Sequence, residues 1–245
     1  MAVITSAANR LFRELLAARK QRDLMLLEGR RLMEDALSRG MAPRLAALTP
    51  RYIQEHGPAG FPHTVISEEL FRRIADTRTP QGILAFFAVP WVPAGELARH
   101  ERIVILDGLQ DPGNVGTIIR TAEAFGFDGI GVTGGTASPF APKAVRSSMG
   151  SVLGVSIARI EVKDLSGFPH RIITLSPRGS AKLSAGLFRP PCAVCLGQEG
   201  SGVSPELSAL AHETVSIAMK GRVESLNVAV AAGIVLAYAG GALEG

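Results

Sequence analysis

The fold of this chain is decided by residues 102–133, which run RIVILDGLQDPGNVGTIIRTAEAFGFDGIGVT. The stretch starts with an unbroken apolar run at 103–106, which is typical of a strand buried on both faces of a sheet. Apolar residues then recur at helical spacing from about Asn114 to Phe125, and Gly126 predicts the end of that helix. A second strand is predicted at 129–133. A strand, a helix and a strand in this order predict a parallel α/β sheet.

The same alternation continues towards the C-terminus. Further strands are predicted at 152–157, 171–175, 192–196 and 215–219, with helices near 139–149, 180–187, 204–211 and 226–238. Unbroken apolar strands that alternate with helices indicate a parallel sheet covered on both faces. Ligands of such sheets bind at the carboxyl ends of the strands, so a site is expected in the loops that follow them.

The first 90 residues predict a separate and smaller α/β domain. A helix is predicted at about 6–20, and short strands at 24–27, 45–48 and 83–89. Pro90, Pro93 and Gly95 then interrupt all periodicity. We therefore expect a small α/β domain at 1–90, a linker at 91–100 and a larger α/β domain at 101–245.

The composition is that of a folded globular protein. Hydrophobic residues make up 47% and charged residues 20%, which excludes a disordered chain. The longest apolar stretch, 226–240, is shorter than the roughly 18 residues that a membrane-spanning helix needs. Arg10 and Arg13 interrupt any apolar core of a signal peptide. The expected location is therefore the cytoplasm.

The positive charge of the chain is concentrated at its start. The net charge is +4, and residues 1–90 hold 13 of the 26 Lys and Arg but only 9 of the 22 Asp and Glu. This bias suits a polyanion such as RNA, but a solvated protein surface explains a modest excess equally well. The candidate RNA-binding residues are Arg10, Arg13, Arg19, Lys20, Arg22 and Arg30, together with Lys143 and Arg146.

Two short motifs point to cofactors that their surroundings disfavour. Cys192 and Cys195 form a C-x-x-C, as in redox pairs and zinc sites. Residues three apart on a strand face opposite ways, and there is no second ligand pair, so buried structural cysteines and no metal are expected. Residues 129–134 match G-x-G-x-x-G, but these glycines lie inside a predicted strand and no acidic residue follows at the required distance. A nicotinamide cofactor is therefore not expected.

Two segments after predicted strands carry polar residues suited to chemistry. Asn114 follows the first strand and suits either the N-cap of the next helix or a substrate contact. Arg120 lies in an otherwise apolar helix, where it either pairs with Glu123 or holds a phosphate. Segment 142–151 is small, polar and basic, and suits a helix C-terminus or a substrate contact equally well.

The last candidate segments lie near the C-terminus. Residues 196–203 contain three glycines, which indicates tight turns or close approach of the backbone to a ligand. The loop has no lysine and Glu199 would repel a phosphate, so a neutral or cationic ligand is the better partner. After the next strand, Ser225 and Asn227 flank Leu226, and Ser225 is expected to cap the last helix.

Together these segments resemble the three ordered motifs of the SpoU (TrmH) family of RNA methyltransferases. Asn114 and Arg120 match the first motif, and Lys143, Ser148 and Gly150 match the second more loosely. The third is matched by Gly197, Glu199, Gly202, Ile217, Met219, Ser225, Leu226 and Asn227. The resemblance covers about 103–240, and the first 90 residues resemble, less specifically, the family's ribosomal-protein-like substrate-binding domain.

The resemblance implies a fold, a cofactor and an assembly that the periodicity does not reveal. The fold would be a parallel α/β domain with a deep trefoil knot, and the assembly a homodimer whose active site borrows residues across the interface. S-adenosylmethionine would be held by Gly197, Gly202, Ile217, Met219 and Leu226. The family usually has proline at the position of Ala218, and alanine fixes φ less firmly, which leaves the cofactor affinity open.

The activity that the resemblance implies is methyl transfer to a ribose 2′-hydroxyl of RNA. Family proposals make the arginine at the position of Arg120 the general base, but a guanidinium does not deprotonate in proteins. We therefore assign Arg120 to the substrate phosphate and to polarising the hydroxyl, which must lie in line with the methyl group. The residues expected to orient the nucleotide are Asn114, Glu199, Ser225 and Asn227.

The RNA itself is less constrained than the reaction. The extra N-terminal domain is typical of ribosomal RNA enzymes, so large-subunit ribosomal RNA is the favoured substrate. Transfer RNA is the alternative substrate, and N1 methylation of guanine is an alternative reaction of knotted enzymes. A non-catalytic RNA-binding module on the same fold is the alternative class, against which the presence of Asn114, Arg120, Ser225 and Asn227 argues.

Overall fold

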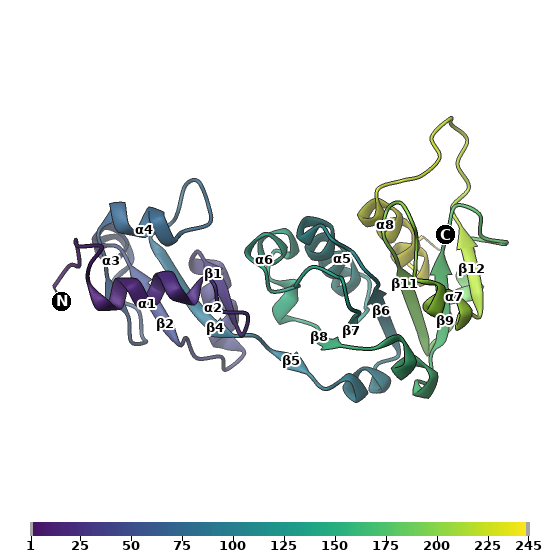
Figure 1. Ribbon diagram of the computed structural model, residues 1–245, viewed down its shortest axis with the longest axis horizontal. Coiled ribbons are helices and arrows are strands. Elements are labelled where there is room, and N and C mark those ends of the chain that lie inside the picture. The colour runs from purple at the N-terminus through teal and green to yellow at the C-terminus, as the bar shows by residue number, and fades with distance from the viewer. Residues whose placement is uncertain (1, 244–245) are drawn as a thin grey trace. The chain divides into compact units, whose positions relative to one another are not determined.

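The computed structural model describes residues 2–243 of the 245-residue chain, except for the side chain of Ala185. The chain divides into two compact units (Figure 1). One unit contains the residues up to Val89 together with 140–142, and the other contains 90–139 and the residues from Lys143 onwards. Each unit is built around a sheet of its own.

The smaller unit is an α/β layer with its own core. Its strands are β1 (Leu24–Glu28), β2 (Leu45–Leu48), β3 (Thr64–Val65) and β4 (Ile83–Ala88), and its helices are α1 (Arg10–Ala18), α2 (Arg30–Ser38), α3 (Pro50–His56) and α4 (Glu68–Ile74). The strand order is β1-β4-β2-β3, with β4 antiparallel to β1 and β2. Phe12 of α1, Phe71 of α4 and Phe86 of β4 are fully buried in one apolar cluster, which ties both helices to the sheet.

The larger unit contains a sheet of eight strands. In chain order these are β5 (Trp91–Val92), β6 (Arg102–Leu106), β7 (Gly129–Val132), β8 (Ser156–Arg159), β9 (Arg171–Leu175), β10 (Ala181–Lys182), β11 (Cys192–Leu196) and β12 (Glu213–Ser216). Their order in the sheet is β10-β12-β9-β11-β6-β7-β8-β5, and every neighbouring pair is parallel. The predicted parallel α/β class is therefore confirmed.

The strand order reverses beside β6. From β6 the chain adds β7 and then β8 on one side, whereas β9 lies on the other side with β11 between β9 and β6. Strands β6 and β11 pair over their full length, from Arg102 beside Cys192 to Leu106 beside Leu196. Parallel sheets bind ligands where the strand order reverses. The loops that follow Leu106 and Leu196 are thus the place where a site belongs.

Four helices accompany the larger sheet: α5 (Pro112–Ala124), α6 (Pro142–Ser148), α7 (Pro205–Ala209) and α8 (Val228–Ala239). Helix α5 follows β6 directly, and α8 packs against both α5 and β11. The chain therefore returns from β12, near the sheet edge, to the centre of the sheet (Figure 1). The trefoil knot in this path stays a prediction.

Several predicted elements of the larger unit differ in the structure. The expected helix at 180–187 is strand β10 followed by a short 3-10 turn, Ala185–Phe188, and the expected strand at 152–157 starts only at Ser156. Strand β12 ends at Ser216, before the predicted 219. In the expected linker, β5 joins the sheet beside β8 and the 3-10 turn Ala94–Arg99 follows. Such short strands depend on pairing with distant neighbours, which the local sequence does not reveal.

The cysteines of β11 are both buried and free, as predicted. Burial raises the pKa of the Cys192 thiol to about 11. Burial, and secondarily the charge of Asp107, raise the pKa of the Cys195 thiol further. Thiolates are the reactive and metal-binding form of cysteine, so neither residue suits redox or metal chemistry at neutral pH.

None of the helices between residues 2 and 243 is both long and apolar enough to cross a membrane.

Candidate active site

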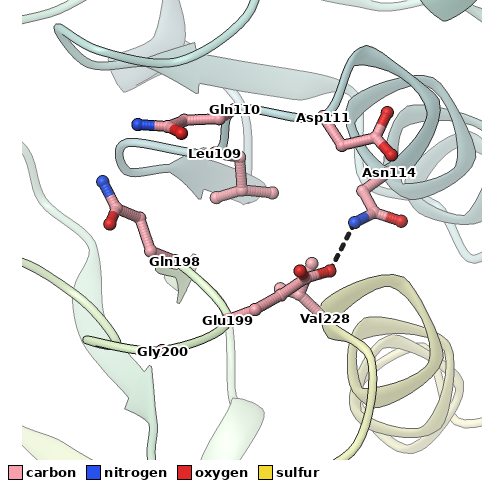
Figure 2. A pocket seen from close by; sticks show the side chains of 8 residues that line it. All are labelled: Leu109, Gln110, Asp111, Asn114, Gln198, Glu199, Gly200 and Val228. Atoms are coloured by element: carbon pink, nitrogen blue, oxygen red, sulfur yellow. Dashed lines mark hydrogen bonds between the residues drawn. The ribbon is translucent and has the colours of Figure 1, made fainter.

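A pocket of about 290 Å³ opens at the carboxyl ends of β6 and β11 (Figure 2). It lies at the reversal of the strand order, where parallel sheets bind ligands. Its walls come from the loop after β6, the first turn of α5, the loop after β11 and the start of α8. The lining residues are Leu109, Gln110, Asp111, Asn114, Gln198, Glu199, Gly200 and Val228.

Glu199 is the centre of a hydrogen-bonded cluster in this pocket. The side-chain amide of Asn114 donates to Glu199 Oε1 over 2.6 Å (Figure 2), and that of Asn227 donates to the same oxygen over 2.9 Å. Asn227 Nδ2 also lies 3.3 Å from Asn114 Oδ1. Within the described chain, Glu199 Oε2 has no hydrogen-bond partner. The cluster therefore orients a carboxylate and leaves one of its oxygens available to a ligand.

The caps of two helices explain why both asparagines can reach Glu199. Asp111, followed by Pro112, caps α5, and its Oδ1 accepts from the Gly113 N–H over 2.6 Å. The predicted cap role of Asn114 is therefore wrong: this residue lies inside the first turn, and its amide is free to turn to Glu199. Asp-Pro at a helix start is a strong sequence signal, which should have indicated the cap.

Helix α8 begins two residues later than expected. Its N-cap is Asn227, whose Oδ1 accepts from the Ala229 and Val230 N–H groups over 2.9 and 3.3 Å, so the predicted cap Ser225 is wrong. Because the oxygen of this amide is held by the helix, its nitrogen is directed to Glu199. One side chain therefore fixes both the start of the helix and the orientation of the carboxylate.

The loop that carries Glu199 is a tight hairpin. Gln198 and Gly202 exchange two backbone hydrogen bonds of 2.9 Å, and Gly202 has a φ of +73°. A Cβ atom on Gly197 would lie 2.0 Å from the carbonyl carbon of Gly202. Only glycine fits at position 197, because any side chain there would push the two ends of the hairpin apart.

We expect Gly197→Ala to destabilise the protein and to abolish function at this site. Overpacking of this kind costs about 1–3 kcal/mol, which corresponds to a Tm lower by about 2–12 °C for a chain of this size. Thermal unfolding followed by circular dichroism measures the shift. Gly200→Ala is the matched control, because a Cβ on Gly200 meets nothing within 4 Å. Equal Tm values for the two variants would contradict the close approach at Gly197.

The chemistry of the pocket walls favours a cationic ligand. Two carboxylates and three amides line it, and no lysine or arginine is among the lining residues. Lys143 is paired with Asp111, one of the lining residues, over 2.7 Å. This hydrogen bond, with that of the Gly113 N–H, lowers the pKa of Asp111 and keeps it ionised. The predicted RNA contact Lys143 thus has an acidic partner at the pocket.

Arg120 does not belong to the Glu199 cluster of its own chain. It lies six residues beyond Asn114 on α5, which places it about 9 Å further along the helix axis. Its side chain is exposed, and within residues 2–243 it forms no ion pair, including with Glu123. The structure therefore leaves this guanidinium available to a partner or a substrate.

The remaining predicted site residues are distributed over other segments. Gly197 and Gly202 shape the hairpin, whereas Ile217, Met219, Ser225 and Leu226 lie on the connection between β12 and α8 and do not line the pocket. Of the second motif, Ser148 is fully buried and donates to the Val145 carbonyl, and Gly150 adopts a left-handed turn after α6. These two residues are structural.

Among the basic residues of the smaller unit, some already have partners. Arg19 donates to the Ile74 carbonyl over 2.8 Å and thereby caps α4. Arg10 and Arg30 pair on the surface with Glu14 and Glu34. The others, Arg13, Lys20 and Arg22, are exposed, as is Arg146 of the larger unit.

The sequence matches models of two known domains. A model of the SpoU rRNA methylase family matches residues 101–237. A model of the MRM3-like substrate binding domain matches residues 13–85. Between them the two matches cover most of the chain.

Similar proteins span nearly its whole length. The chain is 33% identical over 254 residues to an uncharacterised tRNA/rRNA methyltransferase of Synechocystis, which covers 96% of this chain and 92% of the relative. It is 32% identical over 223 residues to the 23S rRNA (guanosine(2553)-2′-O)-methyltransferase RlmP of Bacillus subtilis, with 89% of each chain covered. The AdoMet-bound rRNA methyltransferase of Sinorhizobium meliloti has a TM-score of 0.84 and 29% identity, covering 99% of this chain and 98% of that one.

Proposed function

Because the chain belongs to the SpoU family of RNA methyltransferases, we propose that it methylates a ribose 2′-hydroxyl of large-subunit ribosomal RNA. As a member of this family it is an enzyme that takes its methyl group from S-adenosylmethionine. The proposed substrate follows the name of the Bacillus relative, a 2′-O-methyltransferase of 23S rRNA.

The observation that carries the proposal is the Asn114–Glu199–Asn227 cluster. Three residues from distant parts of the sequence converge on one carboxylate at the end of the central strands. A ribose offers hydroxyl groups, which an oriented carboxylate and two amides can bind as donors and acceptors. A pocket for a phosphate alone would instead be lined by cations and helix-start amides.

The residues of the site fit S-adenosylmethionine. This molecule carries a sulfonium, and the nearby pocket offers only carboxylates and amides as polar side chains. We propose that Gly197, Gly202, Ile217, Met219 and Leu226 hold it. When bound, it supplies an electrophilic methyl carbon. The two backbone hydrogen bonds between Gln198 and Gly202 give one side of the site a fixed shape.

Each polar side chain has a distinct role in the proposed reaction. Asn114 and Asn227 hold Glu199 Oε1, so that Oε2 accepts a hydrogen bond from the ribose. Arg120 binds the substrate phosphate and polarises the reacting hydroxyl. The proton of this hydroxyl passes to solvent as the methyl group is transferred, since a guanidinium cannot accept it. Ser225 approaches the ribose from the β12–α8 connection. Most of the acceleration then comes from holding the hydroxyl in line with the methyl carbon.

We further propose that the enzyme is a homodimer in which Arg120 acts in the site of the partner subunit. Arg120 lies about 9 Å along α5 from Asn114, and within the described residues of one chain no hydrogen bond or ion pair joins it to the cluster. Helix α8 is apolar on all sides, and Val230 is 53% exposed beside the small residues Ala231 and Gly233. A helix that is apolar all round is normally buried, which supports a subunit interface here.

We propose that the smaller unit binds the RNA. The proposed domains are 1–90 and 101–245, and the linker 91–100 joins them. Its match to a substrate binding domain supports this role. Its charge excess supports it too, because released counterions favour binding of basic proteins to RNA. Arg13, Lys20 and Arg22 are the exposed candidates for phosphate contacts. The cytoplasm stays the predicted location.

The experiment that tests the substrate is a map of 2′-O-methylated nucleotides in total RNA from cells with and without the gene. We expect loss of the gene to remove methylation at a single nucleotide of large-subunit rRNA, and a plasmid copy to restore it. Loss of a transfer RNA methylation instead would contradict the proposed substrate. An unchanged map in both RNA classes would contradict the proposed activity.

A further inference from the structure

Asp107 is a buried acid that the roles assigned above do not use. It directly follows β6 and is 6% exposed. Its Oδ2 accepts from the Ser204 backbone N–H over 2.6 Å, and its Oδ1 accepts from the Thr133 hydroxyl over 2.6 Å. Within the described residues, it forms no ion pair. Burying a carboxylate without a cation is costly, so the hydrogen bonds that it accepts must be firmly made.

The contacts of Asp107 hold both ends of the hairpin that carries Glu199. Its backbone N–H donates over 2.8 Å to the carbonyl of Leu196, the last residue before the hairpin. Its carboxylate holds the N–H of Ser204, the residue at which the hairpin ends and α7 begins. The segment between these anchors, 197–203, contains Glu199 and the Gln198–Gly202 pair.

The hydrogen bonds of Asp107 to Leu196 and Ser204 form a clamp at the base of the hairpin. A third hydrogen bond, from the Thr133 hydroxyl to Asp107 Oδ1, ties this clamp to β7. Thr133 follows β7, and its N–H donates over 3.0 Å to the Leu106 carbonyl. The carboxylate of Asp107 therefore joins the carboxyl ends of β6 and β7 to the start of α7. Its backbone N–H adds the carboxyl end of β11. Asn114 lies in the first turn of α5, the helix that follows β6. The clamp therefore fixes the hairpin of Glu199 relative to Asn114, which donates a hydrogen bond to Glu199.

We propose that Asp107 is a positioning residue, which holds the 197–203 hairpin so that Glu199 meets Asn114 and Asn227. The inference rests on the proposed role of Glu199 at the substrate ribose. Displacements of about 1 Å in a catalytic group can lower turnover about a hundredfold. A clamp at the base of the hairpin is therefore expected to act on kcat rather than on RNA binding, for which the smaller unit is proposed.

A matched pair of substitutions isolates the clamp. Ser204→Pro and Ser204→Ala both remove the hydroxyl that caps α7 through the Leu207 N–H. Only proline also removes the backbone N–H that Asp107 binds, and the φ of −58° at Ser204 suits proline. Proline also places its Cδ against the carboxylate, 2.6 Å from the backbone nitrogen, so the difference between the two variants reports loss of the whole Asp107–Ser204 contact.

We expect kcat of Ser204→Pro to be about 10–100-fold below that of Ser204→Ala, with KM for rRNA within about threefold. Hydrogen exchange should be faster in 197–203 of the proline variant and equal elsewhere in the larger unit. Equal kcat values for the two variants would overturn the proposal, and so would equal exchange in the hairpin. If the wild type itself transfers no methyl group to rRNA, the proposed function fails, whereas the exchange comparison still decides whether the clamp exists.

A second pair keeps the proposal testable if Ser204→Pro does not fold. Asp107→Asn can keep both bonds, because its Oδ1 can accept from Ser204 and its Nδ2 can donate to the Thr133 hydroxyl. Asp107→Ala loses both. We expect the asparagine variant to recover most of the kcat that the alanine variant loses. Equal kcat losses in both variants, measured well below their Tm, would show that the position of the hairpin does not depend on these bonds.

Discussion

Replacing Arg120 by alanine is expected to abolish methyl transfer while S-adenosylmethionine still binds. Loss of a preorganised group that stabilises developing charge lowers kcat by about 10²–10³-fold. The side chain is exposed and makes no ion pair among the described residues, so stability should change by less than about 0.5 kcal/mol. Transfer of a labelled methyl group to rRNA gives kcat, and titration calorimetry gives the cofactor affinity.

The control for Arg120→Ala is Arg189→Ala, which removes an exposed arginine of the same unit away from the pocket. Turnover of Arg120→Ala equal to that of this control would rule out the proposed role.

Mixing Arg120→Ala with Glu199→Ala subunits tests where Arg120 acts. If it acts in the partner's site, random exchange between dimers restores about a quarter of the wild-type activity, because half of the dimers then contain one intact site. No recovery would place Arg120 in the site of its own chain.

Substitution of Glu199 should give the second large effect. In Glu199→Ala, the amides of Asn114 and Asn227 lose their shared acceptor, and the ribose loses the proposed Oε2 contact. We expect kcat to fall by about 10²–10³-fold. Glu199→Gln keeps an acceptor oxygen for both amides but loses the charge, so its kcat should lie between those of the wild type and the alanine variant.

Initial rates with rRNA over a range of cofactor concentrations separate kcat from cofactor binding in these variants. Glu101→Ala serves as the control, since it removes an exposed acid at the opposite end of β6. A glutamine variant as slow as the alanine variant would show that the charge matters more than the orientation by the two asparagines. An alanine variant with wild-type kcat would remove Glu199 from the proposed mechanism.

The sequence was sufficient to predict the sheet and the position of the site. The unbroken apolar runs that became β6 and β11 could only be buried strands, and ligands of parallel sheets bind beyond their carboxyl ends. The resemblance to the SpoU family, rather than the strand pattern, assigns Asn114, Glu199 and Asn227 to one substrate, and the structure places these three in one cluster.

Exact helix starts and short strands were harder to predict. Asp111 and Asn114 are both good N-cap residues, as are Ser225 and Asn227, and the cap is decided by which side chain reaches a free N–H. The sequence predicts a helix where strand β10 lies, because the two residues of this strand have too little pattern of their own. It exists through pairing with β12, which lies more than 30 residues away in sequence.

The shared use of Asn227 links catalysis to the order in which the chain is made. Its oxygen caps α8 and its nitrogen orients Glu199, so a chain in which α8 has not formed cannot present the finished carboxylate. Helix α8 follows Asn114 and Glu199 in the sequence, so it is synthesised after both of them. A nascent chain in which α8 has not yet emerged and folded therefore lacks the hydrogen bond from Asn227 to Glu199, so the complete cluster forms only after α8 does.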